Sequence, residues 1–361
     1  MTVFERSGWR LEQGAERSMP ARSLALVVAM LGAALTSSLL FLAVGVDPAA
    51  AMQAILQGAL GSWRAATETL VKATPLIFTG LATAIAFRAR IWNIGAEGQM
   101  FAGAMFGYWC QSAVAGAPPS VQIPVAMVGA IIGGGLYAGL AAVLKIAFRV
   151  DEVISTVMLN YIIVYALSLL LLNGPWSEAG GFFEQTAKVD PPSELPTLLD
   201  RSRLHLGFFL ALTAAAIMHL AITRTPFGYE VRAAGSNLRA LQVQGTETRR
   251  IILLVMLVSG ALAGLAGATE IYGVHHRLKA GALTGYGYTG IIIAILGQLR
   301  PAGIVVAAIL FGALVNGATL MQIKTGVPSA LIYAVEAILL LFFLAGWAAC
   351  SFRLRKVGNV R

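Results

Sequence analysis

The sequence contains little charge and little cysteine for its size. Only 12% of the 361 residues are Asp, Glu, Lys or Arg, whereas soluble globular domains carry roughly 25%. Because 58% of the residues are hydrophobic, the chain has too little polar surface to cover a water-soluble particle of this size. The two cysteines, Cys110 and Cys350, lie far apart inside apolar runs, which implies no disulfide framework. The composition therefore argues against soluble enzymes, nucleic-acid binders and secreted disulfide-rich scaffolds.

Several motifs that carry enzymatic chemistry are missing as well. None of the six lysines follows a glycine, so the sequence has no GxxxxGKS/T loop with which to bind nucleotide phosphates. The patterns HExxH, CxxC and GxSxG do not occur. The one adjacent pair of histidines, His275–His276, does not have the spacing of metal ligands. We therefore expect no catalytic residue, no metal site and no cofactor in this chain.

Long apolar runs, by contrast, are abundant. A membrane-spanning helix needs roughly 20 mostly apolar residues, and the first run, Ser23–Val46, is longer than the roughly 7–15 apolar residues of a cleaved signal peptide. The predicted spans lie at residues 23–46, 70–88, 98–116, 122–147, 153–172, 205–222, 251–272, 286–299, 302–321 and 329–349. The sequence thus predicts an all-α, polytopic membrane protein with about ten transmembrane helices within residues 23–349.

The distribution of Lys and Arg orients these spans. Cytoplasmic loops carry an excess of both residues, and with the N-terminus inside, 18 of them lie on the inner side and 8 on the outer side. Both termini should therefore be cytoplasmic, as tails of residues 1–22 and 350–361. The net charge of +9 then reflects inner loops that face anionic lipid rather than a nucleic-acid partner. Two connections are long: an outer loop at about 173–204, and a cytoplasmic loop at about 223–250 that should contain one or two short helices.

Small residues recur at a spacing of four within the predicted spans. The pairs fall about one turn apart on one helix face and are Gly129 with Gly133, Gly135 with Gly139, and Gly260 with Gly264. Faces of this kind let helices approach closely in lipid. We interpret them as packing surfaces rather than as parts of a site.

Polar residues inside the apolar segments are candidates for a solute path, because ionisable groups are costly in a bilayer unless they are paired or face water. The most polar such segment is NIGAEGQ at 93–99. Its two glycines permit a sharp turn, and irregular backbone at membrane depth must be buried in protein or line water. The segment is either a capped re-entry between two spans or a break that lines the path, and the two interpretations are compatible. The candidate path residues are Asn93, Gly95, Glu97, Gly98, Gln99, Gln298, Asn316 and Glu336.

These features resemble a known family, the inner-membrane permease subunits of ABC importers for simple sugars and nucleosides. The resemblance covers nearly the whole chain, from ATPL at 73–76 through NIGAEGQ to FGYEVRAAGSNLRALQVQG at 227–245, and is strongest to the nucleoside-associated branch. It implies a type II ABC importer permease fold, with two permease subunits around a central path, two ATP-binding subunits below and a substrate-binding protein outside. ATP and Mg²⁺ would be held by the ATP-binding subunits, and the complex would lie in a bacterial inner (plasma) membrane.

Two basic regions are then assigned to partners. The cytoplasmic loop is similar to the family's coupling segment, which sits in a groove of the ATP-binding subunit; a solvated basic loop is the alternative. Leu241 departs from the usual pattern, which has a second alanine after Ala240. The implied coupling residues are Arg232, Ala233, Ala234, Gly235, Asn237 and Gly245. On the outer face, complementary charge predicts that Arg64, His275, Arg277 and Lys279 dock acidic residues of the binding protein, the alternative being contact with lipid headgroups.

The sequence therefore predicts a permease subunit that forms the path for a nucleoside or a simple sugar. It leaves open which solute passes and whether the second permease is identical. Aromatic residues that could stack on a base or a sugar belong equally to interfacial belts; they are Trp92, Tyr108, Trp109, Tyr286 and Tyr288. The alternative is an ion-coupled secondary transporter that would use Glu270 or Glu336 as an ion site. Glu270 lies near the outer end of its span and is expected to reach headgroup water, whereas Glu336 lies deeper.

Overall fold

The computed structural model describes residues 9–13, 19–172, 174–178, 180, 183–327 and 329–356. The chain divides into two compact units, one of residues 59–316 and one that combines residues 1–58 with 317–361. The predicted tails at 1–22 and 350–361 therefore lie partly outside the described residues.

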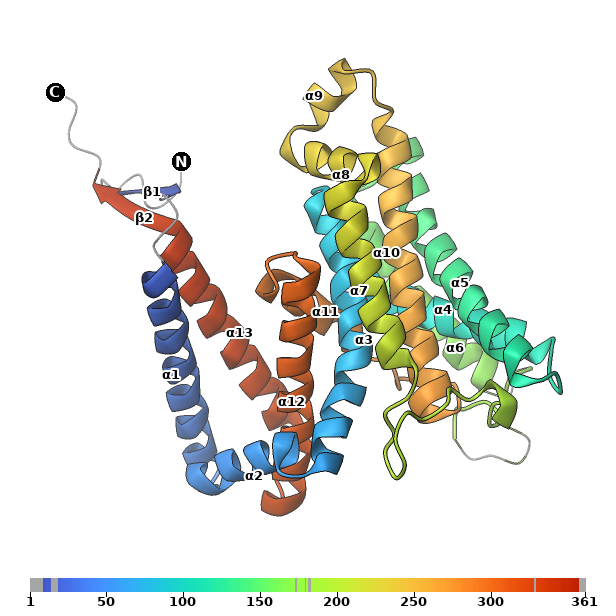
Figure 1. The fold of residues 1–361 in the computed structure, drawn as a ribbon, viewed down its shortest axis with the longest axis horizontal. Helices are drawn as coiled ribbons and strands as arrows, with labels where there is room; N and C mark the ends of the chain where they lie inside the picture. Colours follow the sequence, from blue (N-terminus) through green and yellow to red (C-terminus); the bar gives the residue numbers. More distant parts are fainter. Residues whose placement is uncertain are drawn as a thin grey trace. The chain divides into compact units, whose positions relative to one another are not determined.

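The larger unit is a helical bundle (Figure 1). Its helices are α3 (Trp63–Arg88), α4 (Ala96–Ser112), α5 (Pro119–Phe148), α6 (Glu152–Leu171), α7 (Gly207–Arg224), α8 (Pro226–Ser236), α9 (Leu238–Val243), α10 (Thr248–Glu270), α11 (Tyr286–Leu296) and most of α12 (Pro301–Thr325). A 3₁₀ turn at Pro191–Ser193 lies in the connection between α6 and α7. The cytoplasmic loop, predicted to contain one or two short helices, contains two, α8 and α9.

The smaller unit contains α1 (Met19–Ala43), most of α2 (Pro48–Leu60), the end of α12 and α13 (Ser329–Ser351). Two features of this unit were not predicted. The first is the short helix α2 itself. Its start is capped by Asp47, whose carboxylate accepts the backbone N–H groups of Ala49 (3.0 Å) and Ala50 (3.3 Å). The prediction of an all-α chain also misses an antiparallel pair, β1 (Trp9–Gln13) with β2 (Phe352–Lys356). The segments WRLEQ and FRLRK do alternate apolar and polar residues as strands do, but local patterning cannot show that the two ends of the chain pair with each other.

Six helices among the described residues are long and apolar enough to cross a membrane: α3, α5, α6, α7, α10 with the turn that follows it, and α12. Helix α1 from Val27 onward and α2 meet at 118° and add a seventh if they form one broken span. Helices α4 and α11, with 17 and 11 residues, are shorter than a full span. The chain is thus a helical, multi-pass membrane protein, as predicted, while the count of ten spans stays a prediction.

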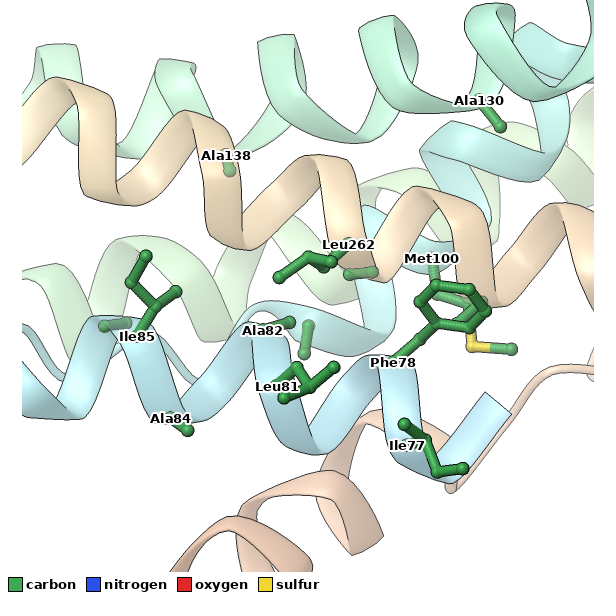
Figure 2. Packing of buried hydrophobic residues seen from close by; sticks show 14 of the residues in the cluster. Ile77, Phe78, Leu81, Ala82, Ala84, Ile85, Met100, Ala130, Ala138 and Leu262 are labelled. Atoms are coloured by element: carbon green, nitrogen blue, oxygen red, sulfur yellow. The ribbon is translucent and has the colours of Figure 1, made fainter. Parts of the chain in front are cut away.

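Helix α3 forms the centre of the larger unit. Its residues from Ala73 to Ala86 are all buried, which is unusual for an amphipathic helix and typical of one that is surrounded on all sides. In Figure 2 its side chains project in several directions, toward more than one neighbouring helix. Helices α10 and α11 both pack against it. At the contact with α11, a Cβ on Gly290 would lie 2.6 Å from Cβ of Thr79 and one on Gly80 would lie 3.0 Å from Cγ2 of Ile293, so the two glycines permit the close approach of α11.

Helices α4, α5 and α10 pack with almost no side chain between their backbones. A Cβ on Gly103 of α4 would lie 2.2 Å from Cα of Gly264 on α10, and one on Gly264 would lie 2.1 Å from the carbonyl oxygen of Ala130 on α5. A Cβ on Gly134 would lie 2.3 Å from the carbonyl oxygen of Gly260. The predicted packing role of the four-residue glycine spacing is therefore confirmed for Gly260 and Gly264.

Candidate functional site

Residues 89–95 connect α3 to α4. Asn93 of this connection, Gln99 of α4 and Ser259 of α10 form a buried cluster of hydrogen-bonded side chains, called here the polar knot. The side-chain oxygen of Asn93 accepts the backbone N–H of Gly95 (2.9 Å) and Nε2 of Gln99 (2.9 Å). Nδ2 of Asn93 donates to Oε1 of Gln99 (3.0 Å) and to Oγ of Ser259 on α10 (2.8 Å). Ser259 donates in turn to the carbonyl of Ala82 on α3 (2.6 Å). The knot joins three helices, and its amides bond each other rather than facing open space.

The start of α4 is held against the middle of α6. Oδ1 of Asn160 accepts the backbone N–H of Gly98 (2.8 Å), and Nδ2 of Asn160 donates to the carbonyl of Ile94 (3.0 Å). Thr156, one turn earlier, accepts the backbone N–H of Ile94 through Oγ1 (3.3 Å). A Cβ on Gly98 would lie 2.9 Å from Cα of Asn160, so this approach requires glycine. The irregular backbone is buried with these polar groups paired, which agrees with a capped re-entry.

Glu97 stands in the first turn of α4 and is only 4% exposed. Its Oε2 accepts the backbone N–H of Gly285 (2.9 Å), the residue before α11, and the backbone of Gly287 and Tyr288 also hydrogen-bonds to the carboxylate. A Cβ on Gly287 would lie 2.3 Å from the backbone nitrogen of Glu97. One carboxylate therefore caps α11 and also lies at the N-terminal end of α4, where helix dipoles favour a negative charge.

Both helix starts lie at the depth of the middle of α6. Asn160 lies eight residues beyond Glu152, the first residue of α6, which is about 12 Å along a helix in a hydrocarbon core about 30 Å thick. Asn160 bonds Gly98 of α4 and, through Nδ2, the hydroxyl of Tyr288 on α11 (3.3 Å). The two helices therefore begin at similar depth. Discontinuous helices whose N-termini lie near mid-membrane are typical of solute sites in transporters.

The other predicted path residues lie elsewhere. Gln298 is exposed and follows the C-terminal end of α11 in a left-handed conformation (φ 54°). Asn316 donates from Nδ2 to the carbonyl of Ala65 (2.9 Å), near the start of α3. Glu336 belongs to α13, and its side chain lies outside the described residues. The structure thus brings together Asn93, Gly95, Glu97, Gly98 and Gln99, and it places Gln298 and Asn316 away from them.

The expectation that Glu270 reaches headgroup water is wrong. Its side chain is 1% exposed, and its Oε2 lies 3.3 Å from Nε2 of His275. Helix α10 does not end in open solvent but continues as a π-helical turn, Ile271–His275. The loop before α7 also covers this turn, because the imidazole of His205 packs directly on Gly273. The burial of Glu270 is therefore a tertiary effect that the local sequence does not reveal.

Two of the four predicted docking residues are already paired within the chain. Arg277 donates to Glu178 in the predicted outer loop, and this bond lowers the pKa of the Glu178 carboxyl. His275 faces Glu270. Of the other two, Arg64 is exposed and Lys279 is half-buried. Less positive charge is therefore available to a partner than the sequence alone suggests.

His205 is a buried, neutral histidine at the start of α7. Its side chain is 1% exposed, and its Nδ1 accepts the backbone N–H of Gly207 (3.1 Å). Burial lowers its pKa from 6.5 to about 4, against a smaller opposing effect of Glu270. An unfolded chain would bind a proton at this position below pH 6.5, whereas the folded chain does so only near pH 4.

Acidification should therefore weaken the folded state through His205. The contribution is fully present above pH 6.5, declines as the pH falls toward 4, and amounts to about 3 kcal/mol over that range. Asparagine can still accept from Gly207 but does not titrate, so His205→Asn should reduce the slope of stability against pH. The measurement is the thermal midpoint of the detergent-purified protein at pH 7.5, 6 and 4.5 for both forms. Parallel curves would show that His205 does not carry this dependence.

In the cytoplasmic loop, the implied coupling residues divide between the interior and the surface. Ala234 is buried, and a Cβ on Gly235 would lie 1.9 Å from the carbonyl oxygen of Arg88, so Gly235 packs against the end of α3. Arg232 donates through Nη1 to the carbonyl of Ile222 at the end of α7. Ala233 is half-buried, Asn237 is exposed at the C-terminal end of α8, and Gly245 adopts φ 84° after α9.

Sequence reasoning missed three exposed apolar residues on this loop. Tyr229 is 56% exposed, Leu238 37% and Val243 90%. Exposed apolar side chains rimmed by polar residues mark interaction surfaces. Apolar residues in an otherwise polar, arginine-rich segment were the available signal. Asn160 was also missed, although it is a polar residue in the middle of a strongly apolar run.

Comparison with known proteins places these features in a wider context. A family model described as "Branched-chain amino acid transport system / permease component" matches residues 65–344, which include the polar knot and the cytoplasmic loop. The guanosine ABC transporter permease protein NupP of Bacillus subtilis is 39% identical over 90% of this chain and 93% of its own. The glucose ABC transporter permease protein TsgB13 of Haloferax volcanii is 32% identical over 88% and 86%. A second guanosine permease protein of Bacillus subtilis, NupQ, is 28% identical over 68% and 78%.

Proposed function

Because the chain belongs to the permease-component family of branched-chain amino acid transport systems, we propose that it is the membrane-spanning subunit of an ATP-driven importer for a nucleoside or a simple sugar. The names of the similar permeases, for guanosine and for glucose, support this class of solute. The solute would pass the mid-membrane starts of α4 and α11. There Glu97, Gly98 and Asn160 hold the starts of the two helices in place. Asn93 and Gln99 hydrogen-bond to each other and stabilise the start of α4.

The observation that carries the proposal is the exposure of three apolar side chains on the cytoplasmic loop, with Val243 of α9, called here the apolar tip, the most exposed of them. Tyr229, Leu238 and Val243 are exposed on a loop that the Lys and Arg distribution assigns to the cytoplasm. The sequence has no Walker loop of its own. The tip is therefore the surface that would enter a groove of an ATP-binding subunit, which would hold the ATP and Mg²⁺. Gly235 would transmit its movement to the end of α3, against which it packs.

The pairing of the two tails supports the proposed topology. Trp9 pairs with Lys356 and Gln13 with Phe352, so the tails lie on one side of any membrane that the chain crosses. This requires an even number of crossings, in agreement with ten spans. With the excess of Lys and Arg on the inner side, both tails would lie in the cytoplasm of a bacterial inner (plasma) membrane. Residues 23–349 would then form the permease domain.

The proposed complex contains three kinds of partner protein besides lipid. Bacillus subtilis has two guanosine permease proteins, NupP and NupQ, and this chain is similar to both at 39% and 28% identity. That difference supports a second permease of a related but distinct sequence. An extracytoplasmic binding protein would deliver the solute. Arg64 and Lys279 are the better candidates for docking it, because His275 and Arg277 already face acidic residues of this chain.

Substitution of Val243 tests the proposal. In the reconstituted complex, Val243→Asp should reduce ATP-driven uptake of radiolabelled guanosine or glucose at least tenfold, because it places a charge where an apolar side chain meets the partner. Solute-stimulated ATP hydrolysis should fall in parallel. Gln244→Asp adds the same charge one residue away without removing an apolar contact and should have a much smaller effect, while Val243→Leu should retain activity.

Two outcomes would contradict the proposal. Full uptake by the Val243→Asp complex would remove the coupling role of the loop. Accumulation of solute by this chain alone in vesicles, abolished by an ionophore, would show an ion-coupled transporter that needs no ATP-binding subunit.

A further inference from the structure

Three tyrosines are exposed near the middle of the bundle, on α6 and α11. The exposed fractions are 54% for Tyr161, 70% for Tyr165 and 39% for Tyr288. We propose that these tyrosines form an aromatic surface on the solute path, which binds the flat ring of an uncharged, nucleoside-like solute. The inference rests on the proposed transport function and assigns the solute contact to residues outside the NIGAEGQ segment.

The depth of the hydroxyl groups indicates that this surface meets water rather than lipid. Tyr161 and Tyr165 lie nine and thirteen residues beyond Glu152, the first residue of α6, which is about 13 and 20 Å along the helix. Neither hydroxyl has a hydrogen-bond partner among the described residues. Tyrosine normally occurs at membrane interfaces, where its hydroxyl reaches water. A partnerless hydroxyl in hydrocarbon is unfavourable, so the two hydroxyls are expected to adjoin a polar medium, on a face of α6 that also exposes Met158 (52%) and Leu169 (74%).

The tyrosines are connected to the buried polar residues behind them. Asn160, which directly precedes Tyr161, donates through Nδ2 to the hydroxyl of Tyr288 (3.3 Å) and also holds the start of α4. Asn93 and Gln99 are buried and bonded to each other, so they have little capacity left for a solute. The polar segment thus serves as support, and Tyr288 continues it to the surface.

The chemistry of the surface favours a flat, uncharged solute. Tyr161 and Tyr165 are four residues apart, so they lie on one face of α6 with Cβ atoms about 6 Å apart. Aromatic rings in this arrangement offer flat faces for stacking on a heterocycle, which every nucleobase provides. The nearby N-termini of α4 and α11 would attract an anion, but the carboxylate of Glu97 already occupies them. A further negative charge, such as a phosphate group, would be repelled.

Cysteine labelling of the assembled complex tests whether the face of α6 that carries Tyr161 and Tyr165 is hydrated. Cys110 and Cys350 are first replaced by alanine, and Tyr161→Cys, Tyr165→Cys and Ile162→Cys are introduced separately. Ile162 is the matched control, because it lies at a similar depth and is 58% exposed but is rotated about 100° from Tyr161 and about 60° from Tyr165 round the helix. A charged, membrane-impermeant thiol reagent reacts with the hydrated thiolate. It should label positions 161 and 165 at least tenfold faster than position 162.

Protection identifies the solute class. Guanosine should slow labelling at position 165 severalfold, whereas guanosine monophosphate and glucose should not. In uptake, Tyr165→Phe should resemble the parent, because it keeps the ring, and Tyr165→Leu should raise KM for guanosine about tenfold. Equal labelling of positions 161 and 162 would overturn the inference, and protection by glucose alone would overturn the ring selectivity. Labelling does not require transport. A complex that labels as expected but shows no ATP-driven uptake would therefore refute the proposed function, while the hydration of this face of α6 would remain supported.

Discussion

Gly264→Ala is expected to destabilise the protein by about 3 kcal/mol, the upper end of what overpacked cores show. The added methyl group would lie 2.1 Å from the carbonyl oxygen of Ala130, so α10 must move away from α5. Backbone on both sides leaves no side chain that can rotate to make room. The shift would also loosen α4, because Gly103 of α4 meets Gly264 at a similar distance. The thermal midpoint in detergent should fall by roughly 5–10 °C.

Gly139→Ala is the matched control for this change. It adds the same methyl group to α5, but the nearest atom is Cδ2 of Leu257 at 3.1 Å, the end of a flexible side chain. Replacing a helical glycine with alanine generally favours the helix by up to about 1 kcal/mol. The control should therefore be neutral or slightly stabilising. Equal losses in the two variants would show that contact between helix backbones is not what makes position 264 sensitive.

Asn93→Ala is expected to lower the free energy of unfolding by at least about 3 kcal/mol, because it leaves several buried polar groups without hydrogen-bond partners at once. Gln99 would lose both partners of its side-chain amide, and the backbone N–H of Gly95 would lose its acceptor. Neither group can reach water, since Gln99 is 2% exposed. Both the thermal midpoint and the solute uptake of the complex should fall, since the knot fixes the start of α4.

A double-mutant cycle distinguishes this mechanism from simple loss of packing. If Asn93 and Gln99 mainly satisfy each other, Asn93→Ala combined with Gln99→Ala should cost clearly less than the sum of the single changes. Asn316→Ala serves as a comparison in the same unit. It removes hydrogen bonds to the carbonyl of Ala65 and to Thr69, and should cost about 1 kcal/mol. Additive effects at positions 93 and 99 would contradict the closed amide pair.

The sequence was sufficient to locate the helices and the polar segment, because both depend on local composition. Each predicted span overlaps a helix, although the ends differ by several residues, as for residues 70–88 against α3 (Trp63–Arg88). The density of polar residues at 93–99 likewise marked the re-entry. Helix α2 was missed because its 13 residues are too few for a span, and the β1–β2 pair because its two strands lie at opposite ends of the chain.

The hydrogen-bond partners of the polar residues could not be predicted, because these partners come from distant parts of the chain. Asn93 meets Ser259, and Glu97 meets Gly285, across separations of 166 and 188 residues. Nothing local to Glu270 reveals that a loop and a π-helical turn bury it. The cytoplasmic loop was found from its charge, whereas its exposed apolar tip became apparent only when Ala234 and Gly235 were seen to pack inward.

The shared carboxylate of Glu97 has a mechanical consequence. Two helices that start at mid-depth are fastened at their starting points, so neither can slide along the membrane normal without breaking the bonds to Gly285 and the following turn. We therefore expect α4 and α11 to travel as one rigid piece during a transport cycle, with the motion that admits and releases the solute taking place at their outer surfaces rather than along the seam between them.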